Sequence, residues 1–274
     1  MGAEVDADGG DRVGRSFGEE GGRLSYGTYL CLPELLGAQR LLSDPPAHDE
    51  LVFITVHQAY ELWFKLMLHE LETARDLLLH GADLWRPRRL LDRVAAIERL
   101  AVDQIDVLET MTPQDFLAFR SQLAPASGFQ SVQFRELEFL SGWKDPAFLD
   151  RLHHATAAEV DRLRRRLAEP TLWDAFLAAV QGAGLAVAPE EARRASLVAI
   201  ATEATAAHQQ LWDLAEALVT HDELARAWRS RHVAMVERQI GTKSGTGGST
   251  GAPYLRSRVE GHYYPELWEL RSWL

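Results

Sequence analysis

The sequence predicts an all-α fold, and two observations carry that prediction. From Glu50 to His80 the chain has no glycine or proline, and its apolar residues recur every three or four positions, as on one face of a helix. Almost no segment alternates apolar and polar residues with the period of two that a half-buried strand shows. The predicted helices are long enough to pack together as a bundle.

The elements follow in order along the chain. The first long helix covers 50–80, and its apolar stripe includes Val56, Tyr60 and Trp63. Thr112 and Pro113 then suit the N-cap and first position of a short helix. Further helices are predicted at about 88–111, 130–141, 147–168, 171–182, 190–219 and 222–240, and a last short one near 264–268.

Two acidic residues precede long predicted helices. Asp49 and Asp222 both stand in the tetrapeptide His-Asp-Glu-Leu, which occurs twice. Neither copy is C-terminal, so neither is a retention signal for the endoplasmic reticulum. Both aspartates are therefore predicted to act as N-terminal caps.

Two segments are predicted to lack regular structure. Residues 1–23 hold seven of the 20 glycines and almost no apolar residues, which predicts a disordered tail with ordered structure beginning near Leu24. Residues 241–253 hold five glycines and predict a loop. This loop lacks the strand and the third glycine of a dinucleotide fingerprint, and the Gly-Lys-Ser/Thr of a P-loop. Its amides and hydroxyls could instead close over a small polar group.

Composition excludes several classes of protein. Lys and Arg total 29 against 40 Asp and Glu, a net charge of −11, which argues against nucleic acid or an anionic membrane surface as the main partner. The sequence contains no run of 18 apolar residues, so no membrane span is expected. The single cysteine, Cys31, excludes an internal disulfide and a Cys-rich zinc site. With no signal peptide, the cytoplasm is the expected compartment.

Two of the ten histidines stand out. His57 shares a helix face with Phe53, and His232 shares one with Trp228 and Val236. Either histidine alone is more often a packed core residue than a ligand. Together, on separate helices, they could face one pocket. No carboxylate or thiolate cluster accompanies them, so a bare zinc or di-iron site lacks ligands, whereas haem needs only one protein ligand and an apolar slot.

The remaining polar candidates are weaker. Arg120 stands between aromatic residues and before a Ser-Gly turn, so it is either a surface ion-pair partner or a fork for a substrate carboxylate. Six other histidines lack such surroundings and are expected to face solvent: His69, His80, His153, His154, His208 and His262.

Four blocks of residues resemble one known family. They are 26–30 (Tyr-Gly-Thr-Tyr-Leu), 53–65 (Phe-Ile-Thr-Val-His-Gln-Ala-Tyr-Glu-Leu-Trp-Phe-Lys), 119–131 with its Phe-Arg and Pro-Ala-Ser-Gly-Phe-Gln-Ser, and 245–251 (Gly-Thr-Gly-Gly-Ser-Thr-Gly). From about Leu24 to the end, the chain resembles the tryptophan 2,3-dioxygenases. The resemblance implies an all-helical haem b enzyme, a homotetramer, that cleaves the indole C2–C3 bond of L-tryptophan with O2 to give N-formylkynurenine. The catalytic, haem-binding domain is then expected over 24–274.

The resemblance also implies roles for particular residues. His232 matches the proximal iron ligand, and His57 the distal histidine that holds the indole N–H. Arg120 matches the partner of the substrate carboxylate, and Thr246 a contact to the substrate's ammonium and carboxylate. The other matches are Phe53 and Phe116 in the indole pocket, Ser127 and Gly128 on the distal haem side, and Tyr26, Tyr29 and Leu30 in an N-terminal segment that enters a neighbouring subunit's pocket. Phe116 stands where some members carry tyrosine.

Three alternatives remain open from the sequence. A family relative with altered chemistry could add one oxygen atom to a substituted tryptophan or indole and give an oxindole. The chain could instead be a haem or tryptophan sensor without turnover, or an all-helical interaction module without haem.

Overall fold

The computed structural model describes residues 24–152, 155–246 and 252–274. By its contacts the chain divides into two compact units, Met1–Arg40 and Leu41–Leu274. The described part of the first unit holds two short helices, α1 (Tyr26–Tyr29) and α2 (Leu32–Leu36). The tail predicted over 1–23 lies outside the described residues. Within those residues every regular element is helical, which confirms the all-α prediction.

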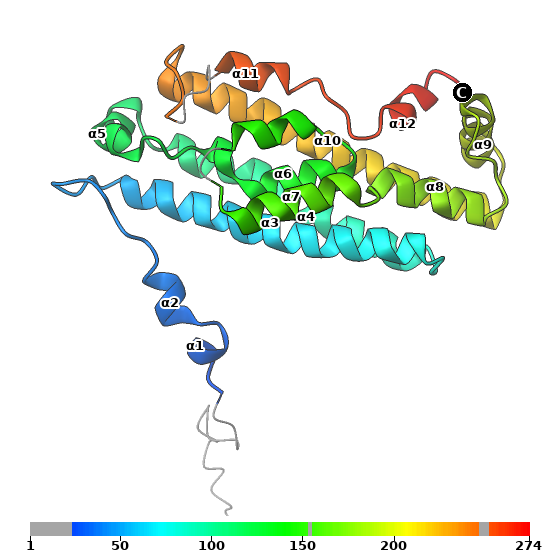
Figure 1. The fold of residues 1–274 in the computed structure, drawn as a ribbon, viewed down its shortest axis with the longest axis horizontal. Coiled ribbons are helices and arrows are strands. Elements are labelled where there is room, and N and C mark those ends of the chain that lie inside the picture. The colour runs from blue at the N-terminus through cyan, green and yellow to red at the C-terminus, as the bar shows by residue number, and fades with distance from the viewer. Residues whose placement is uncertain (1–23, 153–154, 247–251) are drawn as a thin grey trace, which may run out of the picture. The chain divides into compact units, whose positions relative to one another are not determined.

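Three long helices form the body of the second unit (Figure 1). They are α3 (Glu50–Leu79), α4 (Trp85–Glu109) and α10 (Ala206–Ile240). Helix α4 packs against both of the others, so the three lie side by side. Their contacting faces are apolar and fully buried, as the helical spacing of the sequence predicts.

Shorter elements surround this body. They are α5 (Pro113–Leu123), η1 (Gly128–Gln130), α6 (Val132–Ser141), η2 (Pro146–Arg151), α7 (Ala157–Ala168), α8 (Leu172–Gly182), α9 (Glu190–Thr202), α11 (Ala252–Ser257) and α12 (Pro265–Leu270). Both α6 and α8 pack on α3, and α11 packs on α10. Among the described residues no helix is both long and apolar enough to span a membrane.

Local capping fixes where several of these helices start. Thr112 Oγ1 accepts a hydrogen bond from Asp115 N, and Asp115 Oδ2 accepts one from Thr112 N. Pro113 follows at the first helical position, as predicted. The same reciprocal pair of hydrogen bonds, a capping box between Thr156 and Glu159, starts α7. The predicted continuous helix over 147–168 is therefore wrong, because it is divided into η2 and α7.

The division between α9 and α10 also differs from the prediction. Helix α9 ends at Thr202, and α10 then runs without a break from Ala206 to Ile240. Thr205 caps α10 by accepting a hydrogen bond from His208 N. The predicted N-cap role of Asp222 is therefore wrong, because this residue lies in the middle of α10. The apolar spacing is continuous there, and only the acidic residue suggested a helix start.

Asp222 instead fastens the C-terminal segment to α10. Its carboxylate is fully buried. Oδ2 accepts hydrogen bonds from Tyr263 N at 2.9 Å, Tyr264 N at 3.2 Å and Trp268 Nε1 at 2.9 Å. Three N–H donors on one oxygen offset part of the cost of burying this carboxylate, although Oδ1 has no hydrogen-bond partner among the described residues. The other predicted cap, Asp49, does precede α3, but its side chain binds His48 Nδ1 and makes no capping hydrogen bond.

A second buried polar group joins three helices beside Asp222. His221 on α10 lies 2.8 Å from Glu98 Oε1 through Nδ1 and 2.8 Å from Ser141 Oγ through Nε2. Burial alone lowers the pKa of His221, but the charge and hydrogen bond of Glu98, together with the charge of Asp222, outweigh it and raise that pKa. These hydrogen bonds from His221 to Glu98 and Ser141 link α4, α6 and α10 at one level of the bundle.

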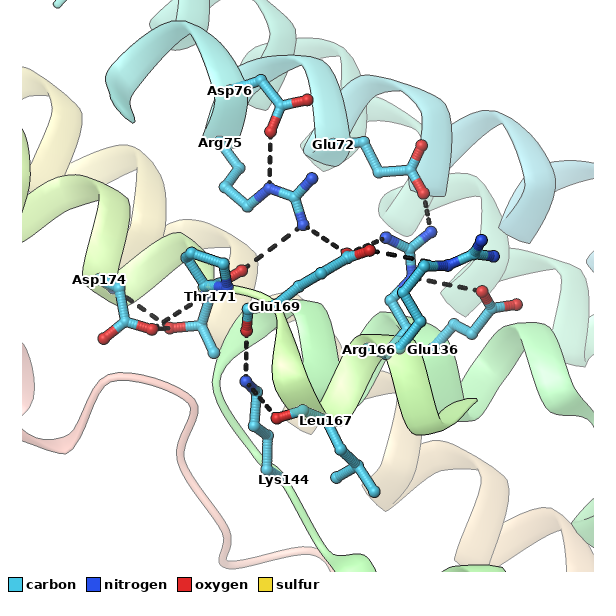
Figure 2. Close-up of polar contacts among 12 residues, drawn as sticks. Glu72, Arg75, Asp76, Glu136, Lys144, Arg166, Leu167, Glu169, Thr171 and Asp174 are labelled. Atoms are coloured by element: carbon cyan, nitrogen blue, oxygen red, sulfur yellow. Dashed lines mark hydrogen bonds and ion pairs between the residues drawn. The ribbon is translucent and has the colours of Figure 1, made fainter. Parts of the chain in front are cut away.

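Ion pairs hold α7 against α3 and α6 (Figure 2). Arg166 on α7 contacts Glu72 of α3 and, at 3.2 Å, Glu136 of α6. Arg75 and Arg166 both bind Glu169, at 2.9 and 3.0 Å. The shared carboxylate ties the end of α7 to α3, which keeps α7 on the outside of the bundle.

The six histidines expected at the surface divide into three groups. His69 and His80 are exposed, as predicted. The prediction is wrong for His208 and His262, which are half-buried, and the His262 ring packs 4.8 Å from that of Trp268. Two adjacent histidines, His153 and His154, lie outside the described residues.

Candidate active site

One pocket in the second unit collects most of the predicted site residues. Its lining comes from α3, α4, α5, α6, α10 and the segments at 127–131, 245–246 and 254–258. The predicted residues that it brings together are Phe53, His57, Phe116, Arg120, Ser127, Gly128, His232 and Thr246. They come from positions almost 200 residues apart in the chain, and the packing of α4 against α3 and α10, and of α5 against α10, brings them together.

His57 presents one bare nitrogen to the pocket. Its Nδ1 lies 2.7 Å from the Phe53 carbonyl oxygen of the preceding helical turn. A carbonyl oxygen only accepts, so Nδ1 carries the proton and Nε2 of the neutral ring is an acceptor. Burial lowers the pKa of His57 and outweighs the carbonyl bond and the charge of Glu61, which raise it. The ring is therefore a neutral hydrogen-bond acceptor near pH 7.

His232 lies on α10 and lines the same pocket. Burial, with a smaller contribution from the charge of His57, lowers its pKa to about 4. The imidazole is then neutral at any physiological pH, which is the protonation state that binds a metal ion. Its ring stacks flat against that of Trp228.

Three phenylalanine rings form an apolar wall beside His57. The rings of Phe53 and Phe116 stack with centroids 5.7 Å apart, and Phe119 meets both edge-on. Phe53 also packs 4.1 Å from the His57 ring. Flat apolar rings beside a single acceptor nitrogen suit a flat aromatic ligand that carries one N–H.

Arg120 and Thr246 lie where α5 meets the glycine-rich loop. Arg120 Nη2 donates to the Ser244 carbonyl oxygen at 2.5 Å, and Thr246 Oγ1 donates to the Ala126 carbonyl oxygen at 2.6 Å. Arg120 Nε is buried and has no hydrogen-bond partner among the described residues. A guanidinium with an unsatisfied donor facing a pocket suits an anionic ligand group. The predicted loop over 241–253 is shorter than expected, because α11 begins at Ala252.

Ser127 and Gly128 begin the short helix η1 at the edge of the pocket. Ser127 Oγ accepts a hydrogen bond from Phe129 N at 3.3 Å, and Ser127 N donates to Gln130 Oε1 at 3.3 Å. This capping turn carries the backbone of Gly128 into the pocket lining.

Sequence reasoning did not single out several further pocket residues. Arg229 on α10 is buried, donates to the Gly261 carbonyl oxygen at 2.7 Å, and has two further nitrogens without a hydrogen-bond partner in the described part of the chain. Arg258 packs 3.6 Å over the ring of Trp143. Charged residues on a helix usually mark its solvent face, so only the structure reveals that these arginines face inwards.

Three predicted residues belong to the first unit. Tyr26 and Tyr29 lie on α1 and Leu30 follows it. Their side chains are 76 %, 70 % and 40 % exposed. Exposed aromatic side chains on a short helix are available for a contact elsewhere, and their part in a site stays a prediction.

Comparison with known proteins identifies the family. The sequence profile of the family described as tryptophan 2,3-dioxygenase matches residues 11–189 and 187–274. A tryptophan 2,3-dioxygenase of Nocardioides sp. is 62 % identical, over 94 % of this chain and 97 % of that protein. Those of Herpetosiphon aurantiacus and Serratia proteamaculans are 47 % and 41 % identical, each over 91 % of this chain and over 98 % and 93 % of their own length. On these matches, the chain belongs to the tryptophan 2,3-dioxygenase family of oxidoreductases.

Proposed function

We propose that this chain is a haem-dependent dioxygenase that adds both atoms of O2 across the indole C2–C3 bond of L-tryptophan and releases N-formylkynurenine. The observation that supports the proposal most is the convergence of His57, His232 and Arg120 on one pocket. His232 offers a neutral metal ligand, His57 an acceptor for an indole N–H, and Arg120 a cation for a carboxylate. Family membership supplies the reaction that combines them.

The pocket residues fit haem b. Its macrocycle is flat and apolar, and aromatic and aliphatic side chains form most of the lining. It also carries two carboxylates, and Arg229 offers buried donors that lack partners among the described residues. His232 would hold the iron, and Ser127 and Gly128 would contact the haem from the same pocket. When bound, the haem iron supplies the binding and activation of O2.

The two charges of the substrate zwitterion need partners once the amino acid leaves water. Arg120 binds the carboxylate through Nε, while Nη2 retains the Ser244 carbonyl. Thr246 lies beside it on the loop and contacts the ammonium and the carboxylate. The two residues therefore fix the amino-acid end of the substrate at the α5 side of the pocket.

The indole ring then lies along the phenylalanine wall. Phe53 and Phe116 form the apolar surface, and His57 Nε2 accepts a hydrogen bond from the indole N–H. The low pKa of His57 makes it a weak base, so it holds this proton without having to remove it. Fixing N1 in this way fixes which bond of the ring faces the oxygen-binding side.

Oligomerisation completes the site in this proposal. Tyr26, Tyr29 and Leu30 are exposed in their own unit, and they cover the indole end of the pocket in a neighbouring subunit of a homotetramer. Apolar cover at this position excludes water from the reacting ring.

Haem reconstitution tests the proposal. Wild-type protein loaded with haem is expected to show a Soret band and, with L-tryptophan and O2, the absorbance of N-formylkynurenine. His232→Ala is expected to lose stable haem binding, and exposed His69→Ala serves as its matched control. Haem-loaded wild type that leaves L-tryptophan unchanged, or His232→Ala with an unchanged spectrum, refutes it.

A further inference from the structure

The ring of Trp228 lies flat on the ring of His232. The two centroids are 4.9 Å apart and the planes differ by only 6°. The residues are one helical turn apart on α10, and both line the pocket. A nearly parallel contact at this distance restricts rotation of the imidazole about its bond to Cβ, because a turned ring meets the indole face.

Trp228 is itself held by a closed ring of aromatic contacts. Its centroid lies 6.0 Å from that of Tyr60 and 4.9 Å from that of Phe134. Phe64 closes the cycle, 5.9 Å from Tyr60 and 5.6 Å from Phe134. We call Tyr60, Phe64, Phe134 and Trp228 the four-ring cluster. It joins α3, α6 and α10, so the orientation of Trp228 is set by three helices.

A hydrogen bond anchors the four-ring cluster from outside. Tyr60 is buried, and its hydroxyl donates to the Ala101 carbonyl oxygen of α4 at 2.8 Å. The cluster therefore contacts every long helix of the second unit. A ring packed in this way loses little further freedom when it orients a neighbour.

His232 differs from His57 and His221 in what reaches its nitrogens. His57 donates to a backbone carbonyl, and His221 is bound at both nitrogens by Glu98 and Ser141. In the described part of the chain no hydrogen bond reaches either nitrogen of His232. Histidines that ligate a metal are usually oriented by an acceptor at their second nitrogen. Here the indole face of Trp228 lies against the His232 ring instead.

From this geometry we propose that Trp228 is a positioning residue, which orients the His232 imidazole for the cofactor iron by stacking in place of a hydrogen bond. The inference rests on the proposed function, in which His232 is the iron ligand. A stacked ring adds no negative charge next to the imidazole, so the ligand stays neutral when the iron is bound. The orientation of the imidazole, and with it the overlap with the iron, then depends on a flat aromatic side chain at position 228.

Three variants of the full-length, haem-loaded protein test this role. Trp228→Leu removes the flat ring, and Trp228→Phe retains a smaller one. Trp212→Leu is the matched control, because Trp212 is a half-buried tryptophan on the same helix whose ring packs against Arg271 and not against the pocket. Circular dichroism and the unfolding midpoint of each variant report whether the fold is retained.

The informative readouts are spectroscopic. In the ferrous protein, resonance Raman measures the iron–histidine stretching band, and transfer to apomyoglobin measures the rate of haem loss. Trp228→Leu is expected to shift and broaden the band and to speed haem loss between about twofold and tenfold, the range for one aromatic contact. Trp228→Phe is expected to lie between the wild type and Trp228→Leu, and Trp212→Leu is expected to match the wild type.

Each outcome decides the proposal. A Trp228→Leu protein that folds and keeps the wild-type band and haem-loss rate overturns it. If Trp228→Leu does not fold, Trp228→Phe decides by the same two measurements. An effect of Trp212→Leu equal to that of Trp228→Leu also overturns it, because the change is then one of general helix packing. Failure of the proposed function is seen separately, as a wild-type protein with no iron–histidine band.

Discussion

At the scale of single residues, burial gives His57 and His232 the same charge but different tasks. Both have lowered pKa values and are neutral near pH 7. The Phe53 carbonyl fixes the proton of His57 on Nδ1 and leaves Nε2 as an acceptor. His232 has the Trp228 ring beside it. Local contacts, more than residue type, therefore separate the proposed substrate partner from the proposed iron ligand.

Replacing His57 by phenylalanine tests its role as an acceptor. The variant retains an apolar ring and loses the nitrogen that binds the indole N–H. We expect kcat/KM for L-tryptophan to fall by about tenfold to a hundredfold, the effect of leaving one buried donor unsatisfied. With 1-methyltryptophan, which has no indole N–H, wild type and variant are expected to have similar kcat/KM. An equal loss with both substrates contradicts the role and points to a change in packing.

At the scale of helices, α10 connects the pocket to the C-terminal segment. Its residue Asp222 holds the backbone before α12, Arg229 holds Gly261, and His232 lies in the pocket. A shift of α10 along its axis would break all of these contacts together. The C-terminal segment therefore helps to fix the position of His232 along the axis of the bundle.

Replacing Asp222 tests this connection. Asp222→Ala leaves three donors unsatisfied in a buried site, so we expect a loss of about 2–5 kcal/mol in the free energy of unfolding, measured with urea. Asp222→Asn retains one acceptor oxygen and is expected to lose less. Asp213→Ala, on the exposed side of the same helix, is the control and should change stability by less than about 0.5 kcal/mol. Equal stabilities of the two alanine variants would count against the connection.

A buried carboxylate at the start of α3 gives a pH-dependent prediction. Burial alone raises the pKa of Glu50, but hydrogen bonds from Ser43 Oγ, Leu42 N and Ser43 N outweigh it and lower that pKa below its usual 4.5. A lowered pKa in the folded state adds stability above the unfolded pKa, and this stability is lost as the pH falls through the folded value.

Glu50→Gln is therefore expected to be destabilised by about 1–3 kcal/mol at pH 7. The difference from wild type should shrink as the pH falls below 4.5, because the wild-type carboxyl group becomes protonated and loses the same bonds. Chemical unfolding at several pH values measures it. A difference that stays constant down to pH 3 contradicts the assignment of the charge to Glu50.

Periodicity and capping patterns predicted most helices. They failed where a charged residue is buried in the middle of a helix. Thr112 and Pro113 start α5 as predicted because the cap is local and needs only neighbouring residues. Asp222 looked like a cap, but its partners are 41 to 46 residues further along the chain. Arg229 gave no signal, because inward and outward arginines look alike in a helical pattern. Contacts between distant segments cannot be read from local spacing.

At the scale of the whole molecule, the proposal has each site completed by the N-terminal segment of a neighbouring subunit. The pocket lies in the second unit, while Tyr26 and Tyr29 are exposed on the first. The prediction of a shared site came from the resemblance of the sequence blocks to the family. The spacing of residues within one chain does not show which subunit the first unit contacts.

Mixed oligomers test whether subunits share sites. Tyr26→Ala/Tyr29→Ala and Arg120→Ala are each expected to lower kcat/KM for L-tryptophan in homo-oligomers. If the N-terminal segment serves a neighbour, some sites in mixed oligomers receive both defects and others receive none. Co-expressed subunits should then be more active than the average of the two parents. Activity equal to that average contradicts exchange between subunits.

The fate of molecular oxygen tests the central claim most directly. Wild-type protein loaded with haem is given L-tryptophan under ¹⁸O2, and the product is analysed at once by mass spectrometry. N-formylkynurenine that carries two ¹⁸O atoms is expected, because both atoms of one O2 are added at C2 and C3 of the indole. A product with a single ¹⁸O atom and an intact ring, as a monooxygenase gives, or unchanged tryptophan, would contradict it.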